Sequence, residues 1–344
     1  MEDQKPELSI DWRSRTGDFR SANLQVSIPP AFQRLIETAS SPIAADALRR
    51  QVEPSEAENR VLPEESADPL GEARYCITPR LVHQYRNRVL LLSTGQCIGH
   101  CRYCFRRNYT ALNEGVIASA ELDTVCEYLA FNQEIREILV SGGDPMSISP
   151  EELQNLLHRI RTSRPDILIR LCTRAPVFAP QLFTSEFLLF LRRMKPLWLI
   201  PHINHSAELG PDQVACLSAC IDAGIPVQSQ TVLLKDINDS PQILEELFNH
   251  LVCIGVKPGY LFQCDLAPGT SHFRVPLAQG FAIWRNLRTL LSGLSLPVYA
   301  VDLPGGGGKF PLVVPALAPL LCSKQDGASF AVQGLDGKVY IYPF

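Results

Sequence analysis

The pattern of apolar and polar residues changes near residue 88. Before it, the chain is polar and rich in proline, with helical periodicity only in residues 31–36 and 44–51 and a charged run, residues 53–68, that we interpret as a connector. After it, short β-rich apolar runs alternate with amphipathic segments long enough for helices. Such alternation predicts an α/β fold with a parallel sheet.

Six of the apolar runs are predicted to be strands. They are residues 89–93, 137–141, 167–173, 197–203, 226–233 and 259–265. Helices are predicted to begin at Pro150, Pro211 and Pro241, because proline fits the first turn of a helix and acidic residues lie close by. Six strand–helix units are too few to close an eight-stranded barrel. We therefore expect an open, six-stranded (β/α)6 partial TIM barrel with its chemistry at the carboxyl ends of the strands.

The predicted barrel is flanked on both sides. We expect residues 1–84 to form a mostly helical N-terminal region and connector, residues 85–311 the barrel, and residues 312–344 a C-terminal extension. In the extension, Asp336-Gly337 lies between apolar runs, which predicts a β-hairpin within residues 330–344.

The composition excludes several classes of protein. With 344 residues, 46% of them hydrophobic, the chain can bury one large core. No segment approaches the roughly 20 uncharged apolar residues of a membrane span. The formal net charge of -4 provides no basic field for nucleic acid. We expect the partner to be a small charged metabolite, with no membrane and no nucleic acid.

Three of the 11 cysteines form a close triplet. Cys97, Cys101 and Cys104 are separated by three and then two residues. A structural zinc site normally has four protein ligands, whereas an iron-sulfur cluster held by three cysteines keeps one iron open. Zinc with a distant fourth ligand, or clustering by chance, is the alternative. The other cysteines are scattered and no secretory signal pattern starts the chain, which favours a reducing cytoplasm without disulfides.

A glycine run precedes a lysine near the end of the predicted barrel. Gly305 to Gly308 are followed by Lys309, within residues 301–311. Glycine allows a close approach of backbone to ligand. A phosphate-binding P-loop would need glycine at Leu303 and a hydroxyl residue at Phe310, so that motif is excluded. A flexible turn stays open on composition alone.

Together, the cysteine triplet and the glycine–lysine segment resemble the lysine 2,3-aminomutase family of radical S-adenosylmethionine (SAM) enzymes. The resemblance covers residues 83–311, and further matching stretches follow in the same order: residues 83–88, 141–145, 201–205, 228–234 and 262–266. It implies that the three cysteines hold a 4Fe-4S cluster whose fourth iron binds SAM. It also implies that Lys309 carries pyridoxal 5'-phosphate (PLP) as a Schiff base, which needs an amine that can be neutral.

The resemblance assigns both cofactors further residues. The amine of SAM would be met by the turn after the second predicted strand, which consists of Ser141, Gly142, Gly143 and Asp144. His202 would contact the same cofactor, with a structural histidine as the alternative. Tyr85 and Arg88 would hold PLP, since arginine donates two parallel hydrogen bonds to phosphate, and Gln230 is a further candidate. The longer lysine enzymes have a second arginine where this chain has Gln84.

Three residues would bind the substrate. Arg106 matches the anchor for the α-carboxylate, and we interpret the adjacent Arg107 as a solvated charge. Asp265 and Asp302 match the two acids that receive the side-chain ammonium. Two carboxylates repel an acidic side chain, whereas a lysine ammonium donates three hydrogen bonds. Each charged hydrogen bond is worth about 1.5 to 3 kcal/mol, so the acid pair predicts lysine rather than glutamate.

The implied reaction converts L-α-lysine to β-lysine by 2,3-migration of the amino group. An electron from a donor such as flavodoxin or ferredoxin would cleave SAM at the cluster, and the resulting 5'-deoxyadenosyl radical would take hydrogen from the β-carbon of lysine. An aminomutase for another amino acid, a radical SAM enzyme without PLP and a non-catalytic iron or zinc protein are the alternatives. The oligomeric state, including a homo-oligomer, stays open.

The match to the family weakens in the C-terminal tail. Longer members carry a zinc site of clustered cysteines there, whereas this tail has only Cys322, so no such zinc is expected. The short length resembles the branch that modifies elongation factor P, but the glycine run and residues 263–265 resemble the enzymes that act on free lysine. The pathway is therefore left open.

Overall fold

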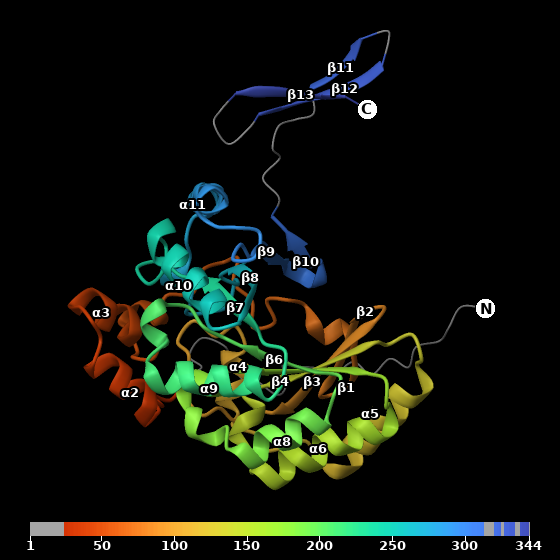
Figure 1. Cartoon of the computed structure of the whole chain (residues 1–344). Helices are drawn as coiled ribbons and strands as arrows, with labels where there is room; N and C mark the ends of the chain where they lie inside the picture. Colours follow the sequence, from red (N-terminus) through yellow and green to blue (C-terminus); the bar gives the residue numbers. More distant parts are fainter. Residues whose placement is uncertain (1–23, 313–319, 325–326, 334–337, 344) are drawn as a thin grey trace.

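Parallel strands form the centre of the computed structural model, which describes residues 24–312, 320–324, 327–333 and 338–343 (Figure 1). They are β3 (Arg88–Thr94), β4 (Glu137–Gly142), β5 (Leu168–Thr173), β6 (Leu197–Pro201), β7 (Gln228–Leu233) and β8 (Lys257–Gln263). The strands are neighbours in this order, and bridges between Leu199 and Val227 and between His202 and Gln230 join β6 to β7. The predicted open, six-stranded barrel is confirmed.

Additional strands extend the barrel at both edges. β9 (Val298–Leu303) pairs in parallel with β8, and β10 (Gly308–Pro311) runs back antiparallel to β9. At the other edge, β2 (Leu81–Tyr85) and β1 (Cys76–Thr78) add antiparallel strands to β3. These strands were not predicted because they are short and lack a continuous apolar run; only Tyr299 and Ala300 of β9 are buried.

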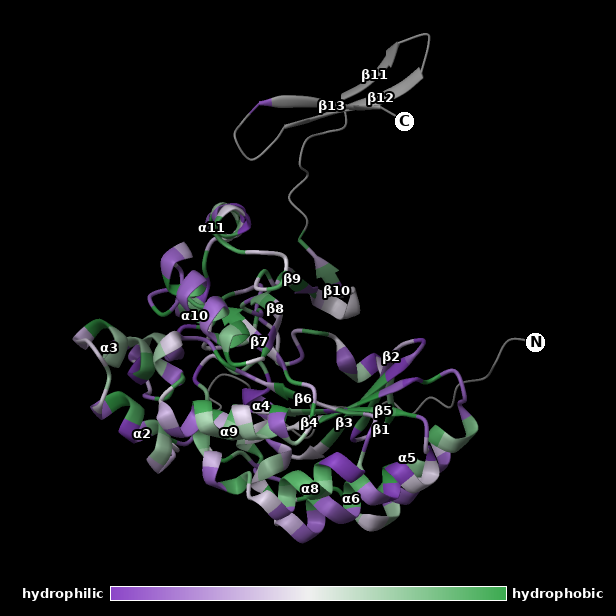
Figure 2. Ribbon diagram, viewed as in Figure 1, coloured by the Kyte–Doolittle hydropathy of each residue, from purple (hydrophilic) through white to green (hydrophobic). Residues whose placement is uncertain are grey.

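Helices connect the strands and cover the outer face of the sheet (Figure 1). They are α4 (Arg107–Ala111), α5 (Ser119–Phe131), α6 (Pro150–Ser163), α7 (Ala175–Phe178), α8 (Ser185–Arg193), α9 (Pro211–Asp222), α10 (Pro241–Cys253) and α11 (Leu277–Leu290). The helix starts predicted at Pro150, Pro211 and Pro241 are confirmed. Ser149 and Glu152 exchange side-chain and backbone hydrogen bonds at the start of α6, which satisfies two N–H groups that a helix leaves unpaired. Figure 2 shows apolar residues on the strands and the helix faces turned toward them.

The N-terminal helices α2 (Pro30–Glu37) and α3 (Pro42–Arg50) form where periodicity predicted them. They share the core of the barrel: Phe32 and Leu48 are fully buried, and the Phe32 ring meets the Phe178 ring edge-on with centroids 5.1 Å apart. Burial of such side chains stabilises the fold by about 1.5 to 3 kcal/mol each. The N-terminal region is therefore packed directly against α7 and the 3-10 helix at Ser206–Glu208, which follow β5 and β6.

The charged run of residues 53–68 is more than a connector. It contains the 3-10 helix η2 (Glu56–Asn59), where the Glu58 carboxylate accepts hydrogen bonds of 2.5 Å from both Arg102 and Arg107. All three side chains are buried. The prediction that Arg107 is a solvated charge is wrong, because its side chain is buried and is neutralised by the Glu58 carboxylate, which lies 49 positions away in the sequence.

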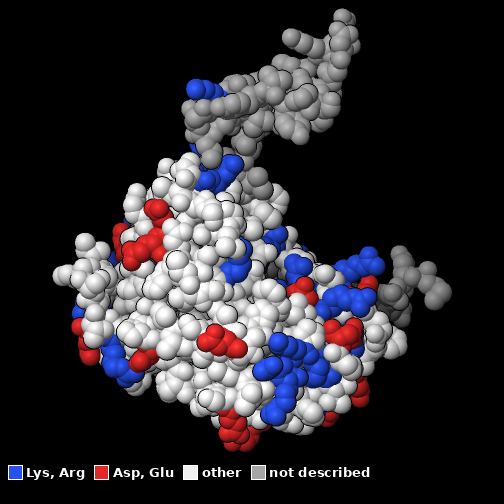
Figure 3. Space-filling view, in the orientation of Figure 1, with Lys and Arg blue, Asp and Glu red and all other residues white. Residues whose placement is uncertain are grey.

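A separate three-stranded sheet follows the barrel in the sequence. It consists of β11 (Leu320–Lys324), β12 (Gly327–Gln333) and β13 (Val339–Pro343), and β12 and β13 pair antiparallel as the predicted hairpin requires. The Asp336-Gly337 turn and the side chain of Cys322 lie outside the described residues. In the part of the chain that is described, no helix is long and apolar enough to cross a membrane. Figure 3 shows basic and acidic side chains spread over one face.

Candidate active site

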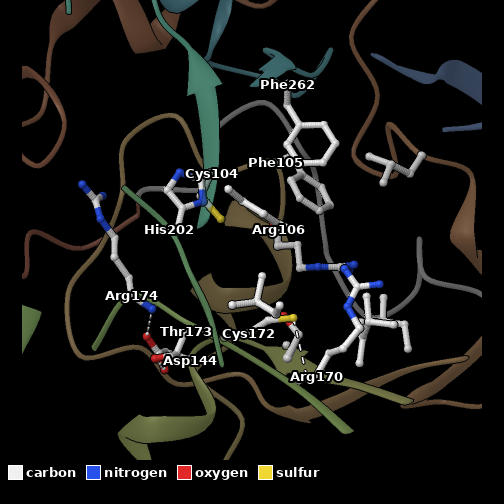
Figure 4. Close-up of a pocket in the computed structure, with 18 of the residues that line it drawn as sticks. Cys104, Phe105, Arg106, Asp144, Arg170, Cys172, Thr173, Arg174, His202 and Phe262 are labelled. Atoms are coloured by element: carbon white, nitrogen blue, oxygen red, sulfur yellow. Dashed lines mark hydrogen bonds between the residues drawn. The ribbon is translucent and has the colours of Figure 1, made fainter. Parts of the chain in front are cut away.

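A cavity of about 490 Å³ lies inside the barrel and extends from Arg88 and Glu137, which begin β3 and β4, to the loops that follow the carboxyl ends of these strands (Figure 4). Every site residue predicted from the sequence lines it. They are Tyr85, Arg88, Cys97, Cys101, Cys104, Arg106, Ser141, Gly142, Gly143, Asp144, His202, Gln230, Asp265, Asp302 and Lys309. Residues more than 220 positions apart thus face one space: β2 and β10 bring Tyr85 and Lys309 to it from opposite edges of the sheet, and the cysteines and Asp144 follow the carboxyl ends of β3 and β4.

The loop that carries the three cysteines directly follows β3. Residues 24–29 hold it: the backbone N–H of His100 donates to Ser27 O at 3.0 Å, and Ser27 Oγ donates to Ile98 O at 3.2 Å. Burial raises the pKa of the Cys97 thiol, and it raises the pKa of Cys104 to about 11. The neighbouring thiols raise both values further. Thiolates in such a place need a bound cation to be stable.

The donor set fits a cluster better than a single ion. Among the described residues, no group of three His, Cys, Asp or Glu side chains is placed to hold one metal ion. The three cysteines nevertheless line the same cavity. In a cluster each thiolate binds a different iron, so the ligands stand farther apart than those around one zinc ion.

The glycines after β4 are required by close packing. A Cβ atom on Gly143 would lie 2.0 Å from Gln96 O, and one on Gly142 would lie 2.5 Å from Thr94 O. Gly142 also has a φ of 117°, which side-chain-bearing residues rarely adopt. The turn after β4 therefore lies directly on the start of the cysteine loop.

Asp144 is buried next to these glycines. Its carboxylate accepts hydrogen bonds from Thr173 Oγ1 at 2.6 Å, from the Met146 N–H at 2.9 Å and from the Arg174 N–H at 2.9 Å (Figure 4). Burial raises the pKa of Asp144, and these hydrogen bonds oppose that effect. Because a carboxylate has about four acceptor positions, these three hydrogen bonds leave one of them, and Asp144 is among the residues that line the cavity.

His202 is neutral and oriented. Burial, and then the charge of Arg174, lower the pKa of His202 to about 3. Its Nε2 lies 3.0 Å from Asn204 Oδ1, and the same oxygen accepts from the Val232 N–H at 2.9 Å. Since that oxygen can only accept, Nε2 carries the proton. The ring stacks on Tyr103 with centroids 5.6 Å apart.

Lys309 extends from the hairpin of β9 and β10, directly opposite Asp302. The glycine run makes the turn of this hairpin, with positive φ at Gly305, Gly306 and Gly308. Lys309 Nζ lies 4.2 Å from the centroid of the Phe262 ring. Burial lowers the pKa of Lys309, although the Asp302 carboxylate opposes the effect. A lysine in such a setting is more readily neutral and nucleophilic than a solvated one.

Two acids share this end of the cavity with Lys309. Burial, and then the charge of Asp302, raise the pKa of Asp265 to about 8. Burial also raises the pKa of Asp302, and Lys309 opposes that effect. The acid pair is thus short of positive charge, and a cation bound there would favour the ionised carboxylates.

Tyr85 joins the hairpin to the other edge of the barrel. Its Oη accepts a hydrogen bond of 2.7 Å from the Lys309 N–H, and the Arg88 guanidinium lies 3.7 Å from the centre of its ring. Gln84 donates to Gly306 O at 3.2 Å. Arg170 and Arg88 line the same cavity, and their positive charges lower the pKa of Lys309 further. Each of these effects is smaller than those of burial and Asp302.

Arg106 is held by an acid that sequence reasoning missed. Glu72, in the 3-10 helix η3 (Glu72–Tyr75), accepts hydrogen bonds of 2.6 and 2.7 Å from the two terminal nitrogens of Arg106. The preceding Gly71 packs on the glycine turn, where a Cβ atom would lie 2.4 Å from Gly306 N, and Tyr75 Oη donates to Gly306 O at 2.9 Å. No local motif marks Glu72 in the sequence. Its role becomes visible only from its direct contact with Arg106.

A second missed group surrounds Arg174, which directly follows β5. Its guanidinium donates to Cys101 Sγ at 2.8 Å, to Gln51 Oε1 at 2.6 Å and to Glu208 Oε2 at 3.1 Å. The rule that chemistry lies at the carboxyl ends of strands could have identified Arg174. Gln51, at the end of α3, carries no such signal.

The part of the chain that carries the cysteine loop matches a known protein family. Residues 86–178 match a family model described as a 4Fe-4S single cluster domain. A solved radical SAM methyltransferase from Sphaerobacter thermophilus overlaps 64% of this chain and 68% of its own, at 17% identity and a TM-score of 0.47.

The relatives extend over nearly the whole chain. A protein of Treponema pallidum, provisionally named L-lysine 2,3-aminomutase, is 54% identical over 97% of this chain and 94% of its own length. The L-lysine 2,3-aminomutase of Acetoanaerobium sticklandii is 37% identical over 93% of this chain and 75% of its own. The glutamate 2,3-aminomutase of Clostridioides difficile is 32% identical over 73% and 59%. The chain is therefore an isomerase of the L-lysine 2,3-aminomutase family of radical SAM enzymes.

Proposed function

We propose that this protein is a SAM- and PLP-dependent aminomutase that converts L-α-lysine to β-lysine. The observation that carries the proposal is that three cysteines, Lys309 and the pair Asp265 and Asp302 line one cavity. The cluster and SAM supply radical chemistry when bound, and PLP carries the amino group that moves. The protein's own part is to bind, orient and shield these groups.

The cysteine side of the cavity suits a cluster with SAM. Cys97, Cys101 and Cys104 would supply three thiolates and leave one iron for SAM. Asp144 keeps one acceptor position for an ammonium, and neutral His202 presents an unprotonated Nδ1. Both groups are held by the protein, so little reorganisation is needed on binding.

The Lys309 side suits PLP. A buried lysine of lowered pKa is the group that attacks an aldehyde carbon, and Arg88 and Arg170 provide positive charge for a phosphate in the same cavity. Tyr85 fixes the backbone of Lys309 through its hydroxyl group. Arg170, which also pairs with Glu137 at 3.2 Å, thus supplies a second cation, although Gln84 replaces the arginine of the longer enzymes.

The acid pair supports lysine as the substrate over glutamate. Burial raises the pKa of both Asp265 and Asp302, and the charge of Asp302 raises the pKa of Asp265 further; a substrate ammonium would relieve this cost of ionisation, whereas a glutamate carboxylate would increase it. Arg106, in turn, provides donors for the α-carboxylate. The relationship to glutamate 2,3-aminomutase alone does not favour glutamate, because the relatives named for lysine are more similar.

The proposal is tested with anaerobically prepared, cluster-loaded protein supplied with a low-potential reductant, SAM, PLP and L-lysine. β-Lysine should form, and L-glutamate in place of lysine should give no β-glutamate. Lys309→Ala should abolish both product and the visible absorbance of bound PLP while leaving the cluster spectrum intact. Absence of β-lysine with both cofactors bound would exclude lysine as the substrate.

A further inference from the structure

Arg174 places a buried positive charge against a ligand of the proposed cluster. Its side chain is 5% exposed, and its terminal nitrogen donates a hydrogen bond to Cys101 Sγ at 2.8 Å, a close contact for a nitrogen and a sulfur atom. The backbone N–H of the same residue donates to Asp144, so the start of its side chain is also fixed (Figure 4). The cation is therefore permanently directed at one sulfur.

Glu208 holds the other side of the guanidinium. This acid, in the 3-10 helix η6 (Ser206–Glu208), has a side chain that is 0% exposed. One of its oxygens accepts from Arg174, and the other accepts from Gln51 Nε2 at 3.0 Å and from the Asn204 N–H at 3.1 Å. The pair is thus locked between the N-terminal helix α3 and the ends of β5 and β6.

Charges at this position act on electron transfer. The potential of an iron-sulfur cluster depends on net charge and on hydrogen bonds to its sulfur atoms. Reduction adds one electron, so a nearby cation stabilises the reduced cluster and a nearby anion opposes it. In a buried site these effects are only weakly screened by water.

We propose that Arg174 and Glu208 set the reduction potential of the cluster in opposite directions, with Arg174 acting through Cys101. Arg174 raises the potential, which makes one-electron reduction easier for a low-potential donor. Glu208 offsets part of that charge and keeps the reduced cluster a strong reductant. The inference rests on the cluster of the proposed function, and it gives both residues a role beyond holding the fold together.

The test is a redox titration followed by electron paramagnetic resonance, with cluster-loaded protein, dithionite as reductant and no SAM. Arg174→Gln should shift the potential to more negative values, and Glu208→Gln should shift it to more positive values. Arg174→Lys, which keeps the charge, should shift it less than Arg174→Gln. Iron and sulfide are measured for every variant, so that only chains with a full cluster are compared.

Arg164→Gln is the matched control. Arg164 is also a buried arginine, but its guanidinium donates to the backbone oxygens of Leu129 and Ile135 and does not line the cavity. This variant should lose stability and keep the wild-type potential. Shifts of the same sign in Arg174→Gln and Glu208→Gln, or no shift in either, would overturn the inference.

Two further outcomes are informative. If Arg174→Gln loses its cluster, the sign of the Glu208→Gln shift decides alone, since a structural role predicts no positive shift. If Arg174→Gln keeps the potential and only weakens SAM binding, Arg174 serves SAM and the inference is wrong. Failure of the wild-type protein to assemble any cluster would count against the proposed function instead.

Discussion

Glu72 accepts two parallel hydrogen bonds from Arg106, at 2.6 and 2.7 Å. Arg106 is also the proposed anchor for the carboxylate of the substrate. Both side chains are 12% exposed, so the pair is largely removed from water. A guanidinium has five N–H donors, and this arrangement leaves the Nε edge for a second carboxylate. Glu72 and the substrate would therefore share one cation.

Replacing Glu72 by glutamine should lower the free energy of unfolding by about 3 to 5 kcal/mol, since a buried arginine then lacks an ionised partner. L-Lysine should stabilise the PLP-loaded variant more than it stabilises the wild type, because its carboxylate replaces the missing partner. The measurement is denaturant unfolding with and without ligand. Lysinamide, which lacks the carboxylate, is the control, and equal stabilisation by the two ligands would contradict the role of Arg106.

Asp265 should make the stability of the ligand-free protein depend on pH. Its pKa of about 8 lies above the ordinary value of 3.8, so between these values the folded chain binds a proton that the unfolded chain has lost. The free energy of unfolding should therefore fall as pH rises from about 4 to 8, by up to about 1.4 kcal/mol per pH unit from this group. Asp265→Asn should flatten the slope in unfolding experiments at pH 5, 6 and 7. An unchanged slope would show that the carboxyl titrates normally.

The acid pair should determine turnover of lysine. Asp265→Asn and Asp302→Asn each remove a charged hydrogen bond to the substrate ammonium, worth about 1.5 to 3 kcal/mol, so kcat/KM for β-lysine formation should fall about 10- to 150-fold. Asp222→Asn, on the outer helix α9, should have no effect. A wild-type rate in either cavity variant would remove the basis for lysine selection.

Gly143 should be needed for cluster assembly. In Gly143→Ala the new Cβ atom would lie 2.0 Å from Gln96 O, so the backbone next to Cys97 must move. Overpacking of this kind costs about 1 to 3 kcal/mol, and iron bound per chain should fall. At Gly293 a Cβ atom meets nothing within 4 Å, so Gly293→Ala should retain iron and stability. Full iron content in Gly143→Ala would mean that the loop adapts.

Local signals made much of this site predictable from the sequence. The spacing of the cysteines, the glycines before Lys309 and the prolines at helix starts each depend on a few adjacent residues, and strands of the expected pattern bring them together. Every proposed site residue consequently lines the cavity.

The partners of these residues were not predictable in the same way. Glu72 meets Arg106, and Gln51 meets Arg174, across 34 and 123 positions of sequence. An acid or amide in a polar segment looks the same whether it faces solvent or a buried cation. For the same reason the sequence predicts that Arg107 is a solvated charge, whereas in the fold the Glu58 carboxylate lies beside it. β9 and β10 escaped prediction because a hairpin of short, half-exposed strands lacks a strong apolar pattern.

The contact of Gly71 with the turn at Gly306 joins two parts of the site that would otherwise be independent. On one side of this contact, η3 carries Glu72; on the other, the hairpin carries Lys309. A side chain on Gly71 would force the two backbones apart, and a Cβ atom on Gly306 would meet the side chains of Tyr75 and Arg74 in η3 at 3.0 and 3.1 Å. Redesign of this enzyme for a different amino acid must therefore change the Glu72–Arg106 pair and the hairpin that carries Lys309 together, because a shift of one backbone moves the other.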